Sequence, residues 1–446
     1  MTELEIKINK SIEKHGLKIP CSAEILTPVH IGSGVKLKKD FDFISEERKT
    51  YIIPQYLVAE YLSRQENINL VDDFMNPDFI PKSILEKIIE QQTDGIREYF
   101  SKCNTRDLNE FERDGDSTPY IPGSSIKGAL RTILLKSHWD ELVTNKDVDK
   151  IEKFFEKVNR RKAEFAADNS LKLIFGHDSN HNIMRLIEPC DIYFNESKLD
   201  LAQIKVLNLT SPTGDEHGWK NLSARKTEKF HKDATSIFSE VLPEGSQANF
   251  SIKLDTFLIN NEKAITELGF EELRDFSISE LSKMINRFTR TNISKELDFL
   301  NKLKTKKELS DLIENLVSLQ KNIPQENSEI EKKEFIIRIA WGTGWKNMTG
   351  DFMDATELLE MRKAFGNKMN YDLNNLNKQF PIFPKSRRII FENNVPSLLT
   401  GFIKVKLNHN YSMAKQKKET VIKEEIFKDD ISKLSKLGPV KITKRK

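Results

Sequence analysis

The sequence predicts an α+β fold, and three observations lead to this prediction. Short runs rich in β-branched and aromatic side chains are typical of strands, and they are interspersed with longer runs whose apolar residues recur at three- and four-residue spacing, as in helices. Glycine-rich segments accompany strand-like runs in both halves of the chain. With 446 residues, 31% charged and 38% hydrophobic, the chain is globular and long enough for roughly three domains of average size or two large ones.

The composition also excludes several classes of protein. No run approaches the roughly 20 apolar residues that cross a bilayer, and the opening MTELEIKINK is too polar for a signal peptide. Cys21, Cys103 and Cys190 are too few and too far apart for a disulfide framework or a cysteine-based zinc site. We therefore expect a cytoplasmic protein with no membrane partner and no bound cofactor.

The net charge of +3 is distributed unevenly along the chain. Residues 411–446 carry 11 basic and 5 acidic side chains, which leaves 60 basic and 63 acidic side chains for residues 1–410. A near-neutral body argues against coating duplex DNA through bulk charge, but it permits a local basic groove. The basic tail at 411–446 is interpreted either as an extra grip on nucleic acid or as a solubilising end.

Strands open the predicted order of elements. Residues 19–26 form a short branched run that ends at a glycine turn. The segment YIPGSSIKGALRTILLKSHW carries one apolar stripe after a Pro-Gly turn, which predicts a helix capped by Ser124 or Ser125. Two alternating runs around Pro-Glu-Gly predict a hairpin within residues 236–257. The other elements predicted in this half are strands at 41–44, 50–54, 184–194 and 204–210, helices at 54–64 and 83–100, and a charged helix that extends to about 165.

The second half begins with helices and ends with strands. Charged helices are predicted across roughly 261–321, and a strand at 335–341 leads into the glycine-rich segment GTGWKNMTG. The last two strands are predicted at 381–391 and 401–410. We expect three units: an N-terminal domain at 1–260 with helical insertions, a C-terminal domain at 261–410 with a helical insertion, and the basic tail.

The first candidate motif is a glycine pair after the first strand. Gly32 and Gly34 flank Ser33, and consecutive amide N–H groups there could face an anion such as a phosphate. A plain turn is the commoner explanation for such a pair. Because the segment lacks the GKS or GKT ending of a nucleotide P-loop, ATP hydrolysis is disfavoured.

The second candidate motif is the helix start PGSSIKGALR. Lys127 and Arg131 are four residues apart, so they share one helix face beside an N-terminus that attracts negative charge. Together with Ser124 and Ser125 they suit a phosphate, although an ordinary helix with a solvated basic face explains the same residues equally well. Gly128 inside a helix costs about 1 kcal/mol relative to alanine, which suggests that a backbone or ligand packs against it.

Two motifs of the second half combine glycine, tryptophan and basic side chains. In WGTGWK the indoles could stack on bases while backbone amides and the lysine hold phosphate, a pattern suited to single-stranded RNA. Alternatively, one or both indoles anchor the loop to the core. The basic cluster in PKSRR either contacts an RNA backbone or is exposed charge. The candidate RNA contacts in these motifs are Gly342, Gly344, Trp345, Lys346, Lys385, Arg387 and Arg388.

Catalytic and metal-binding patterns are weaker. His30 could act as a general acid or base, but a loop histidine bonded to backbone is the favoured interpretation because no partner is evident. His177, Asp178 and His181 could hold a metal ion, but the surrounding glycine and asparagines favour a surface turn. Asp40 and Asp42 could position Mg²⁺, but they lie in a strand-like run, which favours a structural role. We therefore predict no metal site.

Taken together, these motifs resemble the RAMP superfamily of CRISPR RNA-binding proteins. The matching segments are TPVHIGSG after a strand, YIPGSSIKGALRT, GTGW after a late strand, and PKSRR before GFIKVKL. They occur in the family's order across nearly the whole chain, and the combination is specific although no single motif is. More narrowly, they resemble the subunit family that caps the 3′ end of the guide RNA in type III-A (Csm) effector complexes.

This resemblance implies ferredoxin-like (RRM-like) RAMP domains whose glycine-rich loops touch guide RNA (crRNA). It implies a noncatalytic subunit beside the repeated backbone subunit and other Csm subunits, supporting guide maturation and assembly in antiviral defence. Two alternatives remain: a metal-independent endoribonuclease that uses His30, and a scaffold that contacts mainly protein. Recruitment of a host nuclease is also left open. The residues that match the family's motifs are Ser124, Ser125, Lys127 and Arg131 at the helix start and Gly32, Gly34, Gly342 and Gly344 in the loops.

Overall fold

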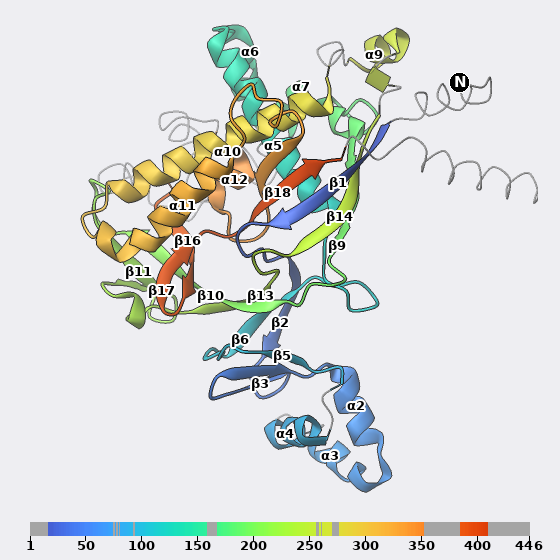
Figure 1. Ribbon diagram of the computed structural model, residues 1–446, viewed down its shortest axis with the longest axis vertical. Helices are drawn as coiled ribbons and strands as arrows, with labels where there is room; N and C mark the ends of the chain where they lie inside the picture. The colour runs from blue at the N-terminus through green and yellow to red at the C-terminus, as the bar shows by residue number, and fades with distance from the viewer. Residues whose placement is uncertain are drawn as a thin grey trace, which may run out of the picture.

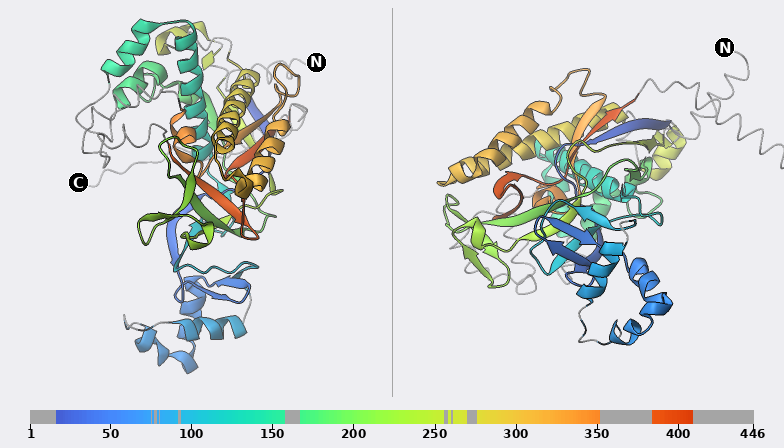
Figure 2. Two further views of the ribbon diagram at one scale, coloured as in Figure 1. Left: turned by 90° about the vertical axis from the view of Figure 1, so that its left-hand side faces the viewer. Right: turned by 60° about the horizontal axis from the view of Figure 1, so that its bottom comes forward.

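The computed structural model shows two large β-sheets, a group of helices, and a small lobe that projects from one end of the molecule (Figure 1 and Figure 2). It describes residues 17–408 except 75, 77–78, 80, 92–93, 158–166, 256–257, 260, 270–275 and 352–383. The predicted basic tail at 411–446 lies outside the described residues. Within them, no helix is both long enough and apolar enough to span a bilayer.

The first sheet is antiparallel and has the strand order β15-β18-β1-β14-β8. Along the chain, β1, α5, β8, β14, α10 and β18 follow one another as β-α-β-β-α-β, and β15 adds an edge strand beside β18. The predicted ferredoxin-like α+β fold is therefore confirmed. The bounds of these elements are β1 Leu17–Ile25, α5 Gly123–Thr144, β8 Ile187–Pro189, β14 Gln247–Leu254, α10 Ile278–Asn301, β15 Glu334–Arg338 and β18 Phe402–Leu407.

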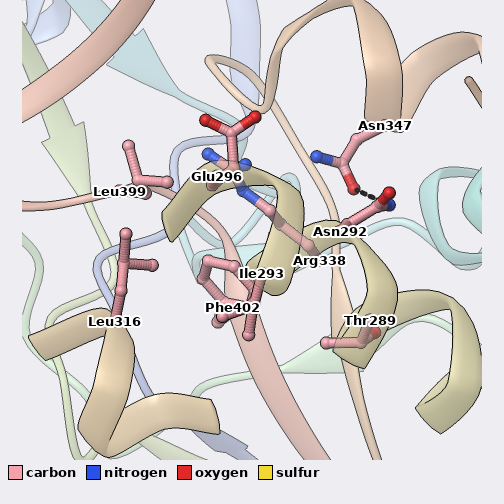
Figure 3. A pocket seen from close by; sticks show the side chains of 9 residues that line it. All are labelled: Thr289, Asn292, Ile293, Glu296, Leu316, Arg338, Asn347, Leu399 and Phe402. Atoms are coloured by element: carbon pink, nitrogen blue, oxygen red, sulfur yellow. Dashed lines mark hydrogen bonds between the residues drawn. The ribbon is translucent and has the colours of Figure 1, made fainter. Parts of the chain in front are cut away.

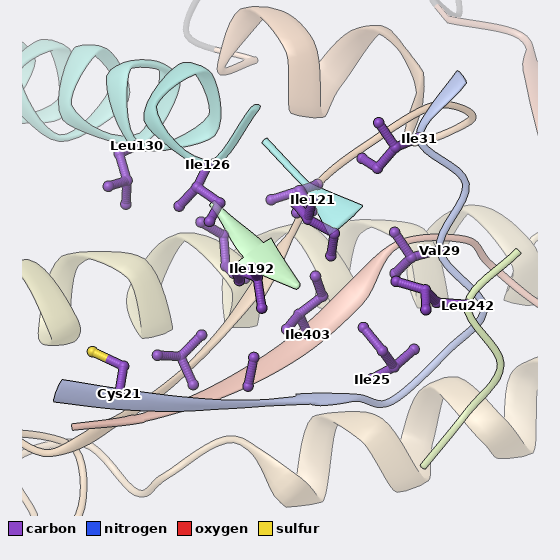
Figure 4. Close-up of a cluster of buried hydrophobic side chains, with 14 of the residues drawn as sticks. Cys21, Ile25, Val29, Ile31, Ile121, Ile126, Leu130, Ile192, Leu242 and Ile403 are labelled. Atoms are coloured by element: carbon purple, nitrogen blue, oxygen red, sulfur yellow. The ribbon is translucent and has the colours of Figure 1, made fainter. Parts of the chain in front are cut away.

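Alternation along β1 builds the main core. Ile19, Cys21, Ala23 and Ile25 are all at most 3% exposed, because every second side chain of the strand points to the same face. Helix α5 covers that face with an apolar stripe that includes Ile126 and Leu130 (Figure 4). The three cysteines are expected from sequence to be small core residues, and this is right for Cys21 and Cys103, which are buried, but wrong for Cys190, which is exposed.

The second sheet is organised around the long strand β10 (Asp200–Leu209). One edge of β10 pairs with β13 (Ile237–Val241) and β11 (His217–Asn221), and the other edge pairs with β16 (Ser386–Glu392). Helix α10 and the neighbouring α11 (Ser310–Asn322) cover one face, where they enclose a second apolar core (Figure 1). The remaining strands of this sheet are β2 Gly32–Lys38, β6 Asp107–Phe111, β12 Lys226–Glu228 and β17 Val395–Leu398.

The predicted hairpin within residues 236–257 is wrong. Both strands form, but β13 pairs with β10 and β6 in the second sheet, whereas β14 pairs with β1 and β8 in the first. The turn between them carries the chain from one sheet to the other: Gly245 donates its N–H to the Ile25 carbonyl at the end of β1. Alternation predicts a strand, but it does not say which partner strand is available.

A small lobe is formed by residues 43–99. Strands β3 (Phe43–Glu46), β4 (Lys49–Ile52) and β5 (Arg97–Tyr99) form an antiparallel sheet, and α2 (Gln55–Ser63) and α4 (Lys82–Gln91) pack on it around their own apolar cluster. The predicted helix at 83–100 thus ends early and continues as β5. The other elements are α3 Leu70–Phe74, β7 Tyr120–Ile121, α6 Val148–Glu156, α7 Asp168–Phe175, β9 Ile192–Tyr193, α9 Glu262–Leu268 and α12 Gly344–Thr349.

Both sides of the predicted boundary at residue 260 contribute to each large sheet. The first sheet takes β1, β8 and β14 from the N-terminal side and β15 and β18 from the C-terminal side. The second sheet combines β10 with β16 in the same way. The division into units at 1–260 and 261–410 stays a prediction, since shared strands do not by themselves define where domains divide.

Gly401 provides a test of how closely the loops of the first sheet pack. Its φ is +95°, and a Cβ at this position would lie 2.2 Å from the Ile339 carbonyl oxygen. We expect Gly401→Ala to lower the free energy of unfolding by about 3 kcal/mol or more, because the clash adds to the backbone strain. The measurement is the urea unfolding curve.

Gly245→Ala is the matched control for this experiment. Its φ is +81°, but no atom lies within 4 Å of the added Cβ, so only the strain of about 1–2 kcal/mol applies. If Gly401→Ala and Gly245→Ala lowered the free energy of unfolding by equal amounts, this would contradict the close packing of Gly401 against the end of β15.

Candidate nucleic-acid interface

The first glycine motif is a strand irregularity. Strand β2 starts at Gly32, and its register against β6 shifts between Gly32 and Lys36, with Gly34 at a φ of +86°. The Ser33 hydroxyl donates a hydrogen bond to the Glu110 carboxylate over 3.3 Å. No atom lies within 4 Å of a Cβ added at Gly34. The pair therefore bends an exposed strand and leaves open space beside it.

His30 precedes this bend and is buried, with 2% of its surface exposed. Its Nδ1 lies 2.7 Å from the backbone carbonyl oxygen of Glu240, which can only accept, so Nδ1 carries the proton and donates. Burial lowers the pKa of the ring, although its contact with Glu240 opposes that shift. The favoured interpretation from sequence, a loop histidine bonded to backbone, agrees with this geometry.

The Glu240 side chain lies in the centre of a buried ionic cluster. It accepts hydrogen bonds from the Tyr99 hydroxyl and, over 2.9 Å, from the Phe111 backbone N–H. Ion pairs from Arg113 at 3.2 Å and Arg97 at 3.3 Å compensate its charge. Because Tyr99 and Arg97 belong to β5, this carboxylate links the small lobe to the end of β13 beside His30.

Trp341 is the first residue of the WGTGWK motif, and it joins this motif to the first glycine motif. Its backbone N–H donates to the His30 carbonyl over 3.1 Å, and its indole lies edge-on to the His30 ring with centroids 5.6 Å apart. The Arg388 guanidinium lies over the same indole at 4.7 Å from its centre. Three segments that are distant in the sequence therefore meet at Trp341. We call His30, Trp341 and Arg388 together the Trp341 junction.

The WGTGWK motif leads into the short helix α12 rather than an open loop. Gly342 and Gly344 have φ of +91° and +84° before and at its start. At its other end, Gly350 packs against α5: an added Cβ would lie 3.2 Å from the Thr132 carbonyl oxygen. Lys346 pairs with Asp351 at 3.4 Å. Helix α12 thus connects the Trp341 junction to the helix that carries the PGSS motif.

The start of α5 differs from the prediction in its cap. The helix begins at Gly123 after Pro122, and within the part of the chain that the structure describes no capping hydrogen bond to Ser124 or Ser125 is present. Instead the Gly123 N–H donates to the Asp191 carboxylate over 2.6 Å. The capping prediction is therefore wrong, because a carboxylate 68 residues away takes the position that a local hydroxyl would fill.

The two predicted cations of α5 have different surroundings. Lys127 is half-buried, and no hydrogen bond or ion pair ties its ammonium group to another residue in the described part of the chain. The Arg131 guanidinium lies 4.6 Å from the centre of the Phe175 ring, and partial burial lowers its pKa. Gly128 is exposed, and no atom lies within 4 Å of an added Cβ. Lys127 is thus the cation that is free to contact a ligand.

The basic cluster of β16 divides between the two faces of its sheet. Arg387 faces α10, where it pairs with Glu296 and lies 4.1 Å from the centre of Phe299. Arg388 faces the opposite side with Trp341. Burial lowers the pKa of Arg388, and its Nε has no hydrogen-bond partner among the described residues. Arg387 therefore holds a helix to the sheet, and Arg388 belongs to the Trp341 junction.

Comparison with protein families adds an assignment to this geometry. The RAMP superfamily model matches residues 22–345, a span that runs from β1 past the end of β15 to the start of α12. The chain belongs to the RAMP superfamily. The resemblance that its motifs indicate is confirmed.

The curated relatives of this RAMP protein share one name. It is 31% identical over 130 residues to the CRISPR system Cms protein Csm5 of Streptococcus thermophilus, a match covering 25% of this chain and 36% of that protein. It is 28% identical over 140 residues to the protein of that name in Methanocaldococcus jannaschii. This match covers 29% of this chain and 33% of that protein. The matches span about a third of these relatives' length.

Two solved structures share the fold of this RAMP protein over most of its length. A chain of a Csm-crRNA-target RNA ternary complex from a type III-A CRISPR-Cas system has a TM-score of 0.56 and 19% identity, covering 87% of this chain and 100% of that chain. The crystal structure of T. onnurineus Csm5 gives a TM-score of 0.51 and 16% identity, and the match covers 86% of this chain and 99% of that chain. At these identities the likeness shows the fold.

Sequence reasoning missed two features of this RAMP surface. Tyr193 is 42% exposed and stacks on Tyr120, with ring centres 5.3 Å apart, directly beside the start of α5. Lys220 on β11 lies near Lys385 and Arg388. Burial is the main cause that lowers the pKa of Lys220, and these two positive charges lower it further. The tyrosine before PGSS is a signal that could indicate an aromatic contact, whereas only the sheet pairing brings Lys220 to this place.

Two hollows among the described residues lie beside these motifs. A groove of about 550 Å³ lies between β2, β6 and the small lobe, but its arginines are paired, as Arg97 is with Glu110 at 2.9 Å. Asp42 on its wall accepts the Lys38 backbone N–H over 2.7 Å, which fits the structural role expected of it. A second cavity under α12, lined by Arg338 and Asn347 among others, has about 10 Å³ and holds no more than a water molecule (Figure 3).

His30 makes the stability of this region depend on pH. Burial lowers its pKa, so the folded state keeps the ring neutral while the unfolded chain takes up a proton below its ordinary pKa of about 6.5. The free energy of unfolding of the wild type therefore falls as pH drops below about 6.5. His30→Asn keeps the donor to the Glu240 carbonyl but does not titrate.

The measurement is urea unfolding of both proteins between pH 7.5 and about pH 5.5. We expect the wild type to have the larger free energy of unfolding at pH 7.5. The difference in free energy of unfolding between the two proteins should become smaller towards pH 5.5. A difference that is constant with pH, or that widens as pH falls, would contradict a buried neutral His30.

Proposed function

We propose that this chain is an RNA-binding subunit of a type III-A (Csm) CRISPR effector complex, where it caps the 3′ end of the crRNA. The shared name of its curated relatives and the Csm-crRNA complex among its structural neighbours support this proposal. In this role it supports guide maturation and complex assembly in antiviral defence, in the cytoplasm. Its protein partners are the repeated backbone subunit and other Csm subunits.

The convergence at Trp341 is the single observation that carries this proposal. Trp341 contacts His30 next to the first glycine motif, Arg388 from the basic strand, and, through α12, the helix that bears Lys127. The glycine bends, cations and aromatic rings of these motifs are thus gathered at one place. Single-stranded RNA binds to such a combination of phosphate contacts and stacking platforms.

The proposed contacts divide the RNA between two kinds of interaction. Lys127, Lys220 and Arg388 hold phosphates, and Tyr193 stacks on a base. Arg387 is left out because it lies on the face that α10 covers, between Glu296 and Phe299. The other residues that we assign to the RNA path are Gly32, Ser33, Gly34, Ser124, Ser125, Arg131, Gly342, Gly344, Trp345, Lys346 and Lys385. Phosphate contacts and stacking carry little base information, so weak sequence preference follows.

The proposed role is noncatalytic. A general base for RNA cleavage must reach the ribose 2′-hydroxyl, but the His30 ring is buried between Phe111 and Trp341 and donates Nδ1–H to a backbone carbonyl. The lowered pKa of His30 has a structural cause, its burial. The endoribonuclease alternative therefore gains no support from the surroundings of His30.

Salt dependence of RNA binding tests the phosphate contacts. For single strands the logarithm of the affinity falls by about 0.7 per log unit of salt for each phosphate neutralised. We expect Lys127→Gln and Arg388→Gln each to lower affinity and to reduce this slope by ~0.7. Tyr193→Ala should instead weaken binding about tenfold at every salt concentration, since stacking contributes roughly 1–3 kcal/mol per base.

Matched controls come from the same chain. Lys263→Gln removes an exposed cation on α9, and Phe230→Ala removes an aromatic ring that is 53% exposed, and both should bind RNA as the wild type does. Fluorescence anisotropy with a labelled single-stranded RNA measures all five variants. Unchanged slopes in Lys127→Gln and Arg388→Gln would overturn their assignment.

Guide length tests the capping role itself. In reconstituted Csm complexes that lack this subunit, or that carry Lys127→Gln, Arg388→Gln and Tyr193→Ala together, we expect short complexes or crRNA with ragged 3′ ends. Complexes carrying the two control substitutions should keep the wild-type distribution of 3′ ends. Sequencing of the bound RNA is the readout, and identical distributions with and without the subunit would contradict capping.

A further inference from the structure

A tightly closed turn follows helix α7. Gly176 ends the helix at a φ of +106°, and a Cβ there would lie 1.6 Å from the His181 carbonyl oxygen. Only glycine fits this position without moving the backbone. One Asp178 carboxylate oxygen accepts the N–H groups of Asn180 and His181 at 2.8 and 2.9 Å. The turn therefore holds residues 177–181 in one defined arrangement.

Three ligand-type side chains converge in this turn. The second carboxylate oxygen of Asp178, Oδ2, lies 3.1 Å from His177 Nε2 and 2.9 Å from His181 Nδ1. One ligand atom from each of the three residues can be chosen so that all lie within 4.8 Å of one another. Around a tetrahedral zinc ion with bonds of about 2.0 Å, neighbouring ligand atoms are about 3.3 Å apart. The two distances to Asp178 are thus close to those of a metal-bound set.

We propose that His177, Asp178 and His181 bind one divalent transition-metal ion of the zinc class. Imidazole nitrogen and carboxylate oxygen are ordinary zinc ligands, and three protein ligands leave a fourth position open for water or another ligand. The site lies at the C-terminal end of α7, where the helix dipole favours a cation. This inference is independent of the proposed RNA-binding function.

The competing explanation is a metal-free turn held by hydrogen bonds. His181 Nδ1 also lies 2.8 Å from Asp178 Oδ1, and the two imidazole rings stack with centres 4.1 Å apart. Ring N–H groups donated to the carboxylate would give the same distances without any ion. The sequence favours this plain surface turn, and the convergence of ligand atoms is what the structure adds.

Zinc binding by the tag-free full-length chain distinguishes the two explanations. Titration against a chromophoric zinc chelator should give one Zn²⁺ per chain for the wild type. His177→Ala, His181→Ala and Asp178→Asn should each weaken binding by at least about tenfold, since even the loss of groups that only support metal ligands costs 10–100-fold. His138→Ala is the matched control, because it removes a histidine on α5 outside the turn and should leave binding unchanged.

Thermal unfolding of the same proteins separates loss of ligands from loss of fold. In EDTA the variants should unfold within a few degrees of the wild type, and added Zn²⁺ should raise the midpoint only in the wild type and in His138→Ala. Absence of stoichiometric zinc binding by the wild type would overturn the site in favour of the metal-free turn. Equal zinc affinity in the wild type and the three turn variants would overturn it as well.

Discussion

Strand β1 pairs with β14 on one edge and β18 on the other, and its position determines how the other segments pack. Backbone hydrogen bonds on both edges of β1 fix the place where it ends, and that end lies beside the start of β18 and the end of β15. The segments that leave these strands must then pack together. Gly401 N–H bonds to the Pro28 carbonyl and Trp341 N–H to the His30 carbonyl, so segments more than 300 residues apart form one surface.

Electrostatics gives this surface its chemical character. Lys220, Lys385 and Arg388 lie close enough for the latter two to lower the pKa of Lys220, although burial is the larger cause. Like charges held in proximity are unfavourable in the free protein, and a bound polyanion relieves that repulsion. The buried carboxylate of Glu240, in contrast, has neighbours of opposite charge, because Arg97 and Arg113 form ion pairs with it within the fold. Arginines around Glu240 therefore stabilise structure, whereas Lys220 and Arg388 have no ion-pair partner in the described part of the chain.

Local pattern predicted much of the fold, and partner choice was the part it could not predict. The stripe on α5 and the alternation of β1 are periodic signals, so both elements and the core that they share follow from sequence. The hairpin at 236–257 fails because β13 and β14 find longer partners in different sheets. Likewise, Asp191 rather than a local serine caps α5. Arg387 and Arg388 look alike in sequence, but only the register of β16 against β10 sends one to α10 and the other to Trp341. The family resemblance supplied the order of the motifs, and the sheet supplied their convergence.

In the proposed function, the segments around Trp341 form a single RNA-contacting surface. Hydrogen–deuterium exchange of the chain, followed by mass spectrometry during titration with a single-stranded guide-type RNA, tests it most directly. We expect peptides covering 27–34, 123–131, 341–350 and 385–388 to lose exchange together, with one common midpoint. Protection of β11 and β12 alone, separate midpoints for these segments, or no protection at any of them would contradict it.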